Sequence, residues 1–174
     1  MITLKKWAFF IFSLLQIVWL AGCTEKSYES IERDRNFIAS LNIQEPSLDF
    51  IDENGHVLAK WLFDRAYSGA TLLGDDQVLL YGHQLNTIDV YTLSTGEKLY
   101  SQKVEVGTTN VYYDDNIKQF FITNSKTNTV TSFDHEGNVL ASKRIGNYPM
   151  SMASYKDRLY VINFKDTKLS VLNM

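Results

Sequence analysis

The feature that most constrains the fold is an internal repeat with a period of about 41 residues. Three glycines, Gly55, Gly96 and Gly137, are 41 residues apart, and each lies within a similar segment: 52–59, 92–99 and 134–141. A second register repeats in parallel, because the apolar segments at 79–83, 120–124 and 159–163 each precede another short segment rich in Thr, Val and aromatic residues. Similarity in two independent registers predicts a chain built from repeated structural units.

Each unit has the pattern of four short strands. In the middle unit we predict strands at 110–113, 119–123, 129–133 and 139–144, with an Asp-x-x-Gly turn before the last one. Glycine allows the positive φ of a tight hairpin, and the Asp side chain can accept hydrogen bonds from the turn backbone. Helical periodicity is absent after about residue 46. Four strands every 40 residues predict an all-β fold of β-propeller-type blades, each with four antiparallel strands.

The repeats resemble the YVTN-type repeats of bacterial surface and periplasmic propellers. The resemblance covers about residues 47–174, and its departures are 80–83 (LYGH), where Thr-Asn is expected, and the Pro before the first strand, which survives only as Pro149. It implies an exported protein, and similar propellers include quinone-dependent dehydrogenases and lactonases. The matching residues are Ile122-Thr123-Asn124 with Asn128-Thr129-Val130, and the segment 93–98 (LSTGEK).

The number of blades is anomalous. Two complete units span about 69–106 and 109–145, and the flanking sequence adds two strands before them and three after them. This makes about three and a half blades, whereas closed propellers typically have four to eight. We therefore expect a shortened product of a longer gene or a partial propeller completed by self-association; an open stack of sheets is the third alternative. The flanking strands are predicted at 48–52, 57–63, 150–154, 159–163 and 169–172.

The first residues have the pattern of a lipoprotein signal peptide, 1–22. Lys5 and Lys6 precede an apolar run at 7–20, which is too short to span a bilayer comfortably as a helix. The following Leu-Ala-Gly-Cys at 20–23 resembles the lipobox of bacterial lipoproteins. This resemblance implies cleavage before Cys23 and acylation of that residue with fatty acids such as palmitate, and so a membrane-anchored protein on the extracytoplasmic side.

Residues 23–46 are expected to form the lipidated N-terminus and a spacer. They are polar and charged, and Ile31, Ile38 and Leu41 allow at most a short amphipathic helix. Residues 47–174 are then the β-propeller-like domain. The whole chain has 20 acidic and 17 basic residues, and this balance argues against a nucleic-acid partner, which needs clustered Lys and Arg. Cys23 is the only cysteine, so no intramolecular disulfide is expected.

No residue set in the sequence has the spacing of a catalytic or metal site. The three histidines lie in or near turns of different units, so we expect them to be exposed and not to share a metal. The adjacent acids at 75–76 and 114–115 lack the alternating spacing of a calcium loop and are expected to be solvated turn residues. The recurring aromatics fit blade cores. These residues are His56, His83 and His135, and the aromatic positions 112–113, 120–121, 155 and 160.

The function expected from these observations is non-enzymatic. We expect a membrane-anchored binding or scaffold module of the cell envelope, without a cofactor, whose partners are the membrane, a second copy or an envelope protein. The alternatives are a remnant or subunit of a propeller enzyme, of the quinone-dependent dehydrogenase or lactonase kind, and a truncated chain without independent activity. By analogy with propellers, ligand-contacting segments are expected at Tyr67-Ser68-Gly69, Gly107-Thr108-Thr109 and Asn147-Tyr148-Pro149.

Overall fold

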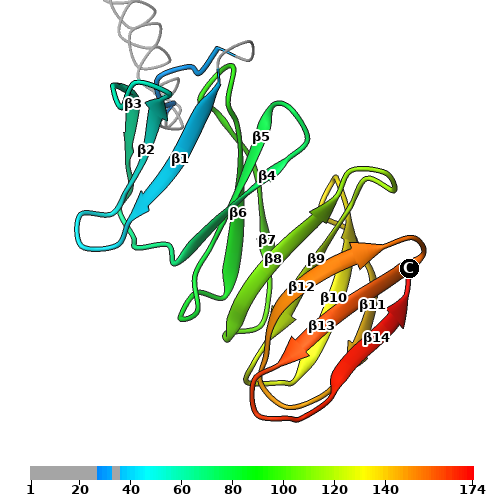
Figure 1. Cartoon of the computed structure of the whole chain (residues 1–174). Coiled ribbons are helices and arrows are strands. Elements are labelled where there is room, and N and C mark those ends of the chain that lie inside the picture. Colours follow the sequence, from blue (N-terminus) through cyan, green and yellow to red (C-terminus); the bar gives the residue numbers. More distant parts are fainter. Residues whose placement is uncertain (1–26, 33–35) are drawn as a thin grey trace, which may run out of the picture.

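The protein is an open array of four small antiparallel sheets that stack side by side (Figure 1). The structure is a computed structural model, and it describes residues 27–32 and 36–174. These residues form 14 strands in four meander sheets, which confirms the all-β, propeller-type prediction. In this part of the chain no helix is long and apolar enough to cross a membrane. The predicted signal peptide and Cys23 lie outside the described residues.

The four sheets are named blades 1 to 4 in chain order. Blades 2 and 3 have four strands each, and blades 1 and 4 have three in the described residues. Blade 1 consists of β1 (Phe37–Asn42), β2 (Ser47–Asp52) and β3 (Val57–Leu62), and blade 2 of β4 (Gly69–Leu73), β5 (Gln77–Tyr81), β6 (Thr87–Thr92) and β7 (Lys98–Lys103). Blade 3 consists of β8 (Thr108–Asp114), β9 (Gln119–Asn124), β10 (Thr129–Asp134) and β11 (Val139–Arg144), and blade 4 of β12 (Pro149–Tyr155), β13 (Arg158–Asn163) and β14 (Leu169–Asn173).

Strand β1 departs from the sequence-based prediction. Residues 37–42 were expected in a spacer with at most a short helix, but they form a strand that pairs along its whole length with β2. The physical reason is a period of two: Phe37, Ala39 and Leu41 pack against the core between blades 1 and 2, while Ile38 is exposed. Upstream, the backbone N–H of Ile31 donates to Leu93 O at 2.8 Å, and the Ile31 side chain is buried. The blade array therefore begins before residue 47.

The predicted hairpin turns form as expected. In the turn between β2 and β3, Asp52 Oδ1 accepts the backbone N–H of Asn54 (2.9 Å) and of His56 (2.8 Å). Asp134 makes the equivalent pair of hydrogen bonds in the turn between β10 and β11. Gly55 and Gly137 both have positive φ, 84° and 88°. The equivalence of these turns makes β2 and β3 the third and fourth strands of their blade, with β1 as the second.

The core consists of three apolar layers, one between each pair of neighbouring blades. Blades 1 and 2 enclose the most aromatic layer, where Phe50 and Trp61 are fully buried with their ring centroids 4.9 Å apart. Between blades 2 and 3, Phe120 stacks on Phe133 at 4.8 Å. The layer between blades 3 and 4 is smaller and includes Val161. Each blade is thus stabilised by its neighbours, and within the described part of the chain each end blade has one face that no other blade covers.

Candidate functional site

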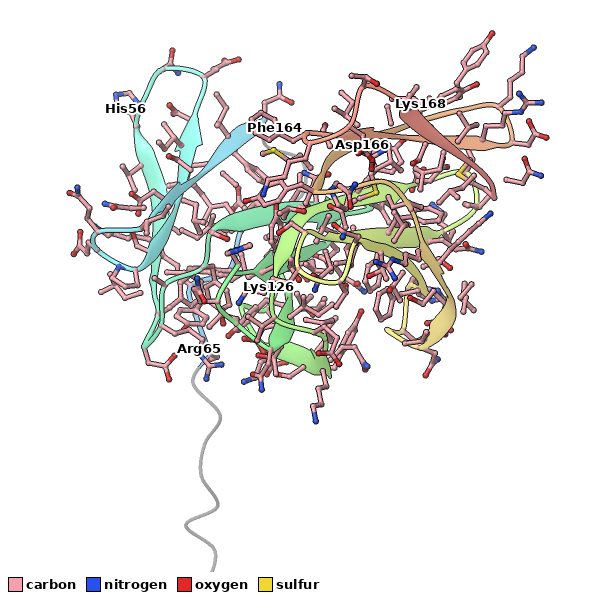
Figure 2. The ribbon with its side chains drawn as sticks, turned by 90° about the horizontal axis from the view of Figure 1, so that it is seen from below. His56, Arg65, Lys126, Phe164, Asp166 and Lys168 are labelled. Atoms are coloured by element: carbon pink, nitrogen blue, oxygen red, sulfur yellow. The ribbon has the colours of Figure 1, made fainter. Side chains whose placement is uncertain are left out.

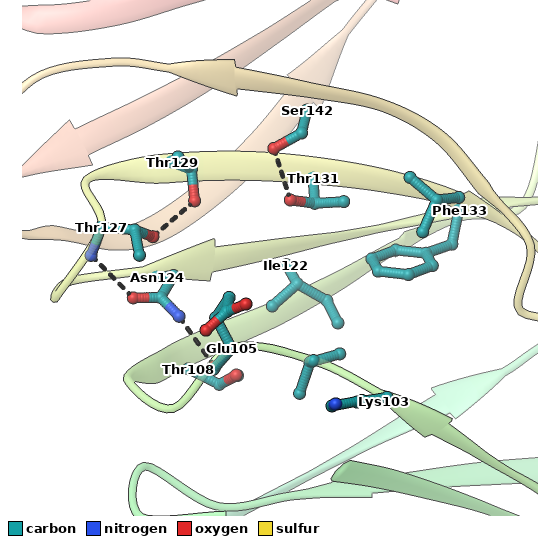
Figure 3. Close-up of a pocket in the computed structure, with 12 residues that line it drawn as sticks. Lys103, Glu105, Thr108, Ile122, Asn124, Thr127, Thr129, Thr131, Phe133 and Ser142 are labelled. Atoms are coloured by element: carbon teal, nitrogen blue, oxygen red, sulfur yellow. Dashed lines mark hydrogen bonds between the residues drawn. The ribbon is translucent and has the colours of Figure 1, made fainter. Parts of the chain in front are cut away.

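A groove of about 460 Å³ lies where blades 2 and 3 diverge (Figure 3). Its floor and one wall come from the face of blade 3 that looks toward blade 2, and its other wall comes from the end of β7 and the link to β8. The blade 3 face becomes more polar and more exposed across its width, from the buried Ile122 on β9 to Thr131 on β10 and the exposed Ser142 on β11. The lining residues are Lys103, Val104, Glu105, Thr108, Ile122, Asn124, Thr127, Thr129, Thr131, Phe133, Val139 and Ser142.

Hydroxyl groups dominate the polar part of the groove. Thr127 and Thr129 hydrogen bond through their side chains at 2.8 Å, and Thr131 bonds Ser142 at 2.9 Å. Thr108 differs from them, because its side chain is 1% exposed and its Oγ1 has no hydrogen-bond partner within the described part of the chain. Figure 3 shows this oxygen directed toward the interior of the groove. A buried hydroxyl without a partner is rare and calls for an explanation.

The link from β7 to β8 is held in place by Asn124. Its side-chain amide donates to the carbonyl oxygens of Glu105 (2.8 Å) and Val106 (3.2 Å), while Oδ1 accepts the backbone N–H groups of Lys126 and Thr127. Every polar atom of this 5% exposed side chain is therefore used. Asn124 thus holds the backbone of the link at Glu105 and Val106, and the Glu105 and Lys103 side chains line this wall of the groove (Figure 3).

A second, smaller cavity of about 180 Å³ lies at a buried carboxylate between blades 1 and 2. Asp89 on β6 is 3% exposed and accepts hydrogen bonds from the hydroxyls of Tyr67 and Ser101. Burial raises the pKa of Tyr67 and of the neighbouring Tyr91, so both phenols keep their protons at neutral pH. The hydroxyls of Tyr67 and Ser101 stabilise the buried Asp89 side chain, and the cluster joins the loop after β3 to the centre of blade 2.

The outer face of blade 4 is an exposed apolar surface. The register of β12, β13 and β14 places Ala153, Tyr160 and Val171 in one row and Ile162 beside Leu169 in the next. Ile162, Leu169 and Val171 are 55%, 52% and 46% exposed. The charged residue that these three strands place on this face is Arg158, in the row of Tyr155 and Asn173. In blades 2 and 3 the equivalent face is covered by the next blade.

The outer face of blade 1 has a different chemistry. Ser40, Asp49 and Lys60 form a polar row across the middle of the sheet, and the exposed Ile38 and Leu62 lie on either side of that row. Lys60 Nζ forms a salt bridge with Glu45 Oε2 at 2.7 Å, and Asp49 Oδ1 accepts a hydrogen bond from the Ser47 hydroxyl at 3.3 Å. The two ends of the array are therefore not copies of one another.

The three histidines lie in different turns, and His56 and His135 are exposed as predicted, whereas His83 is partly buried. His56 is in the β2–β3 turn, where its Nδ1 lies 3.3 Å from Asp52 Oδ2, and Figure 2 shows it projecting outward from blade 1. His135 lies at the β10–β11 turn with Nε2 3.4 Å from Glu136, and the backbone N–H of His83 donates to Ser68. Among residues 27–32 and 36–174, no group of three or more His, Cys, Asp or Glu side chains lies close enough to hold a metal ion.

The acidic turn residues follow the prediction only in part. Asp115 is exposed and pairs with Lys118 at 2.6 Å. Asp114 is buried instead of solvated, and a hydrogen bond from Ser154 holds the pKa of its carboxyl below the ordinary value. Asp76 accepts both the backbone N–H (2.9 Å) and the hydroxyl (2.8 Å) of Ser94. Asp76 thus connects the β4–β5 turn to the β6–β7 turn, and Asp114 connects its turn to β12 of blade 4.

The three predicted ligand segments lie in different parts of the structure. Thr108 of the segment 107–109 lines the groove, and Tyr67 of the segment 67–69 belongs to the Asp89 cluster. The ring centroids of Tyr148 and the exposed Phe164 are 6.0 Å apart, and Figure 2 labels Phe164 in blade 4. The aromatic prediction is confirmed for Phe120 and Phe121, which are buried, whereas Tyr155 is 65% exposed. Sequence reasoning missed Lys103 and Glu105 on one wall of the groove and Thr131 on the blade 3 face, because neither the link after β7 nor a single strand residue shows in the sequence what it will face.

Comparison with known proteins places the fold among β-propellers. No protein-family model and no curated protein sequence matches the chain. Among solved structures it is similar to virginiamycin B lyase from Staphylococcus aureus, with a TM-score of 0.69 and 14% identity over 89% of this chain and 55% of that one. Hydrazine synthase from Kuenenia stuttgartiensis has a TM-score of 0.67 and 12% identity over 87% and 47%. BamB from Moraxella catarrhalis has 0.57 and 16% over 78% and 39%.

These likenesses concern the fold alone, because the sequence identities are low. The chain spans about half the length of the lyase and synthase chains that it matches, and less of BamB. Its four blades therefore superpose on part of a longer chain in each case.

Proposed function

We propose that the protein is a lipid-anchored, non-enzymatic binding and scaffold module of the cell envelope, built from YVTN-type repeats, whose propeller is completed by a second copy. The anchor is supported by the Lys5-Lys6 and apolar 7–20 segments followed by Leu-Ala-Gly-Cys at 20–23. Lipid on Cys23 would place the blades on the extracytoplasmic side of the membrane. One acyl chain gives only marginal binding, so a residue with several chains is a durable anchor.

The observation that carries the proposal is the exposed apolar outer face of blade 4. A contiguous surface of this kind, with Ile162, Leu169 and Val171 about half exposed, is typical of an interaction site. In a propeller this side of a blade is covered by the next blade, which also has an apolar face. The chain spans about half of the lyase and synthase chains, so two copies together have about the length of one such chain. We therefore assign the covering blade to a second copy.

The chemistry of the two ends favours a head-to-tail arrangement. The three strands of blade 4 place Arg158 on the outer face and no acidic residue beside it, so a second blade 4 would offer this charge no partner. Blade 1 offers Asp49 in the middle of its outer face and apolar residues, Ile38 and Leu62, on either side. Blade 4 of one copy against blade 1 of the other therefore pairs opposite charges and apolar surface. If both ends of both copies are used, the ring closes.

The mass of the protein in solution tests this proposal. The detergent-solubilised full chain is expected to sediment as a dimer, and I162K is expected to convert it into a monomer that remains folded. The matched control is L140K, because Leu140 is 50% exposed on β11 of blade 3, away from both end faces. A wild-type monomer, or a dimer that tolerates I162K, would contradict the second copy.

The anchor is tested separately. The wild-type chain is expected to incorporate labelled palmitate in a bacterial host and to partition with the membrane. C23S is expected to lose both properties, because the serine hydroxyl does not replace the thiol as the acceptor of the diacylglyceryl group. Labelling that persists in C23S would contradict the lipoprotein assignment.

The non-enzymatic role is supported by the acidic side chains of the turns. Asp52, Asp76 and Asp134 each accept backbone hydrogen bonds from their own or a neighbouring turn, which is a structural use of a carboxylate. Asp89 is likewise occupied by Tyr67 and Ser101. The test is substrate turnover: lactone hydrolysis or quinone-dependent alcohol oxidation above the background of a heat-denatured sample would contradict this part of the proposal.

A further inference from the structure

The groove between blades 2 and 3 has the properties of a ligand site, and we propose that it binds a neutral carbohydrate of one or two sugar units, with Thr108 hydrogen bonding to a sugar hydroxyl. Its volume of about 460 Å³ is within the range of small-molecule sites. The groove lies within one copy of the chain. The inference therefore does not depend on self-association or on the lipid anchor.

The first observation that favours a ligand in the groove is the Thr108 hydroxyl. Its Oγ1 is buried and has no hydrogen-bond partner among the described residues, although it lies at the groove. Leaving such a hydroxyl unsatisfied destabilises the protein, so a ligand atom that bonds it recovers free energy on binding. By contrast, the neighbouring Thr109 hydroxyl donates to Pro149 O at 2.6 Å and serves the contact between blades 3 and 4.

The balance of charge and hydroxyl groups is the second argument. Lys103 and Glu105 contribute one positive and one negative charge to the same wall, so the groove has no net preference for an ion. In the Thr127–Thr129 pair, one hydroxyl donates to the other and the second still has a hydrogen to give. The same holds for Thr131 with Ser142. A sugar hydroxyl both donates and accepts, which suits this mixture, whereas a phosphate only accepts and would be repelled by Glu105.

The floor of the groove is the third argument. Ile122 and Phe133 form it, and Val104 and Val139 extend the apolar surface toward the opening. A sugar ring has an apolar face of C–H groups and a rim of hydroxyls, so it can cover such a floor while its rim meets the threonines. The arrangement of a few polar groups around an apolar base is typical of sites for small molecules.

Binding of maltose and N,N′-diacetylchitobiose to the detergent-solubilised full chain tests the inference. Saturation-transfer difference NMR is expected to detect at least one of these two disaccharides at millimolar affinity. T108V is expected to weaken that binding about threefold to tenfold, the loss that corresponds to one hydrogen bond. Val has nearly the shape of Thr, so the variant should remain folded, and its unfolding transition is measured to verify this.

The matched control is S132A. Ser132 follows Thr131 on β10 and therefore points to the opposite face of blade 3, so its removal should leave sugar binding unchanged. Three results would overturn the inference. These are no transfer to either disaccharide up to about 20 mM, equal binding by T108V and wild type, or tighter binding of glycerol 3-phosphate than of both disaccharides.

Discussion

The side-chain amide of Asn124 on β9 donates to the backbone carbonyl oxygen of Glu105 at 2.8 Å, across 19 residues of sequence. This hydrogen bond ties the link between blades 2 and 3 to the second strand of blade 3. The same link forms one wall of the groove, so the Asn of the Ile-Thr-Asn repeat motif has a structural role here. It holds the backbone of the link between the two blades in place.

Replacing Asn124 with Ala should therefore lower the free energy of unfolding by about 3 kcal/mol, because two carbonyls and two N–H groups lose a partner in a buried place. Urea denaturation measures the change. N86A is the control, since Asn86 is an exposed turn residue, and its effect should be below about 0.5 kcal/mol. Similar midpoints for both variants would mean that the link is held by other contacts.

Two turn glycines with the same backbone conformation should differ in their tolerance of Ala. Gly55 and Gly96 both have positive φ, so each substitution strains the backbone by about 1 kcal/mol. At Gly55 a β-carbon has free space around it, whereas at Gly96 it would collide with the backbone carbonyl of Tyr28. G96A should cost about 3 kcal/mol and expose the segment 27–32 to proteolysis. Equal losses in the two variants would contradict the docking of that segment on blade 2.

The buried carboxylate of Asp89 makes the Tyr67 hydroxyl important for stability. Y67F removes one of its two hydroxyl donors and should lower the free energy of unfolding by about 2 kcal/mol. Y155F, at an exposed tyrosine, should have almost no effect. In a double-mutant cycle, Y67F and S101A should be non-additive because both hydroxyls bond the same carboxylate. Additive losses would mean that the two hydrogen bonds act independently.

Alkaline pH should destabilise the protein partly through Tyr100. Burial, with the nearby Asp134 and Glu136, raises the pKa of this phenol to about 12, from an ordinary value of 10.0. Between these two values the unfolded chain has lost the proton and the folded chain keeps it, so stability decreases as the pH rises. Below pH 10 the contribution is constant. Y100F should have a shallower decrease of the denaturation midpoint between pH 10 and 12, and an unchanged slope would contradict this assignment.

The strand pattern could be read from the sequence wherever the repeat carries it. The turns at Gly55, Gly96 and Gly137 locate the last two strands of three blades, and the structure has strands on both sides of each. Strand β1 was not predicted, because residues 37–42 lie outside the repeated motifs. Their alternation of Phe37, Ala39 and Leu41 becomes decisive only when β2 offers a pairing edge and blade 2 an apolar layer.

The candidate site was less accessible to sequence reasoning. Thr108 was within a predicted ligand segment, but only because propellers commonly use that link. Thr131 and Ser142 belong to strands in which hydroxyl residues are ordinary, and their shared face follows from the pairing of β10 with β11. Asp114 was predicted as a solvated acid and is buried, because Ser154 from blade 4 packs over its turn.

The sequence by itself determined the repeat, the four-stranded blade and the chemistry of its turns, because these depend on local conformational preferences and on alternation within each strand. Only the tertiary structure decided which faces meet, which hydroxyls line a groove and which apolar residues stay uncovered. Those properties arise from the stacking of blades that are distant in the chain. Ile162 on the uncovered face and Val161 in the core are neighbours in one strand, and the next blade, present on one side only, makes the difference between them.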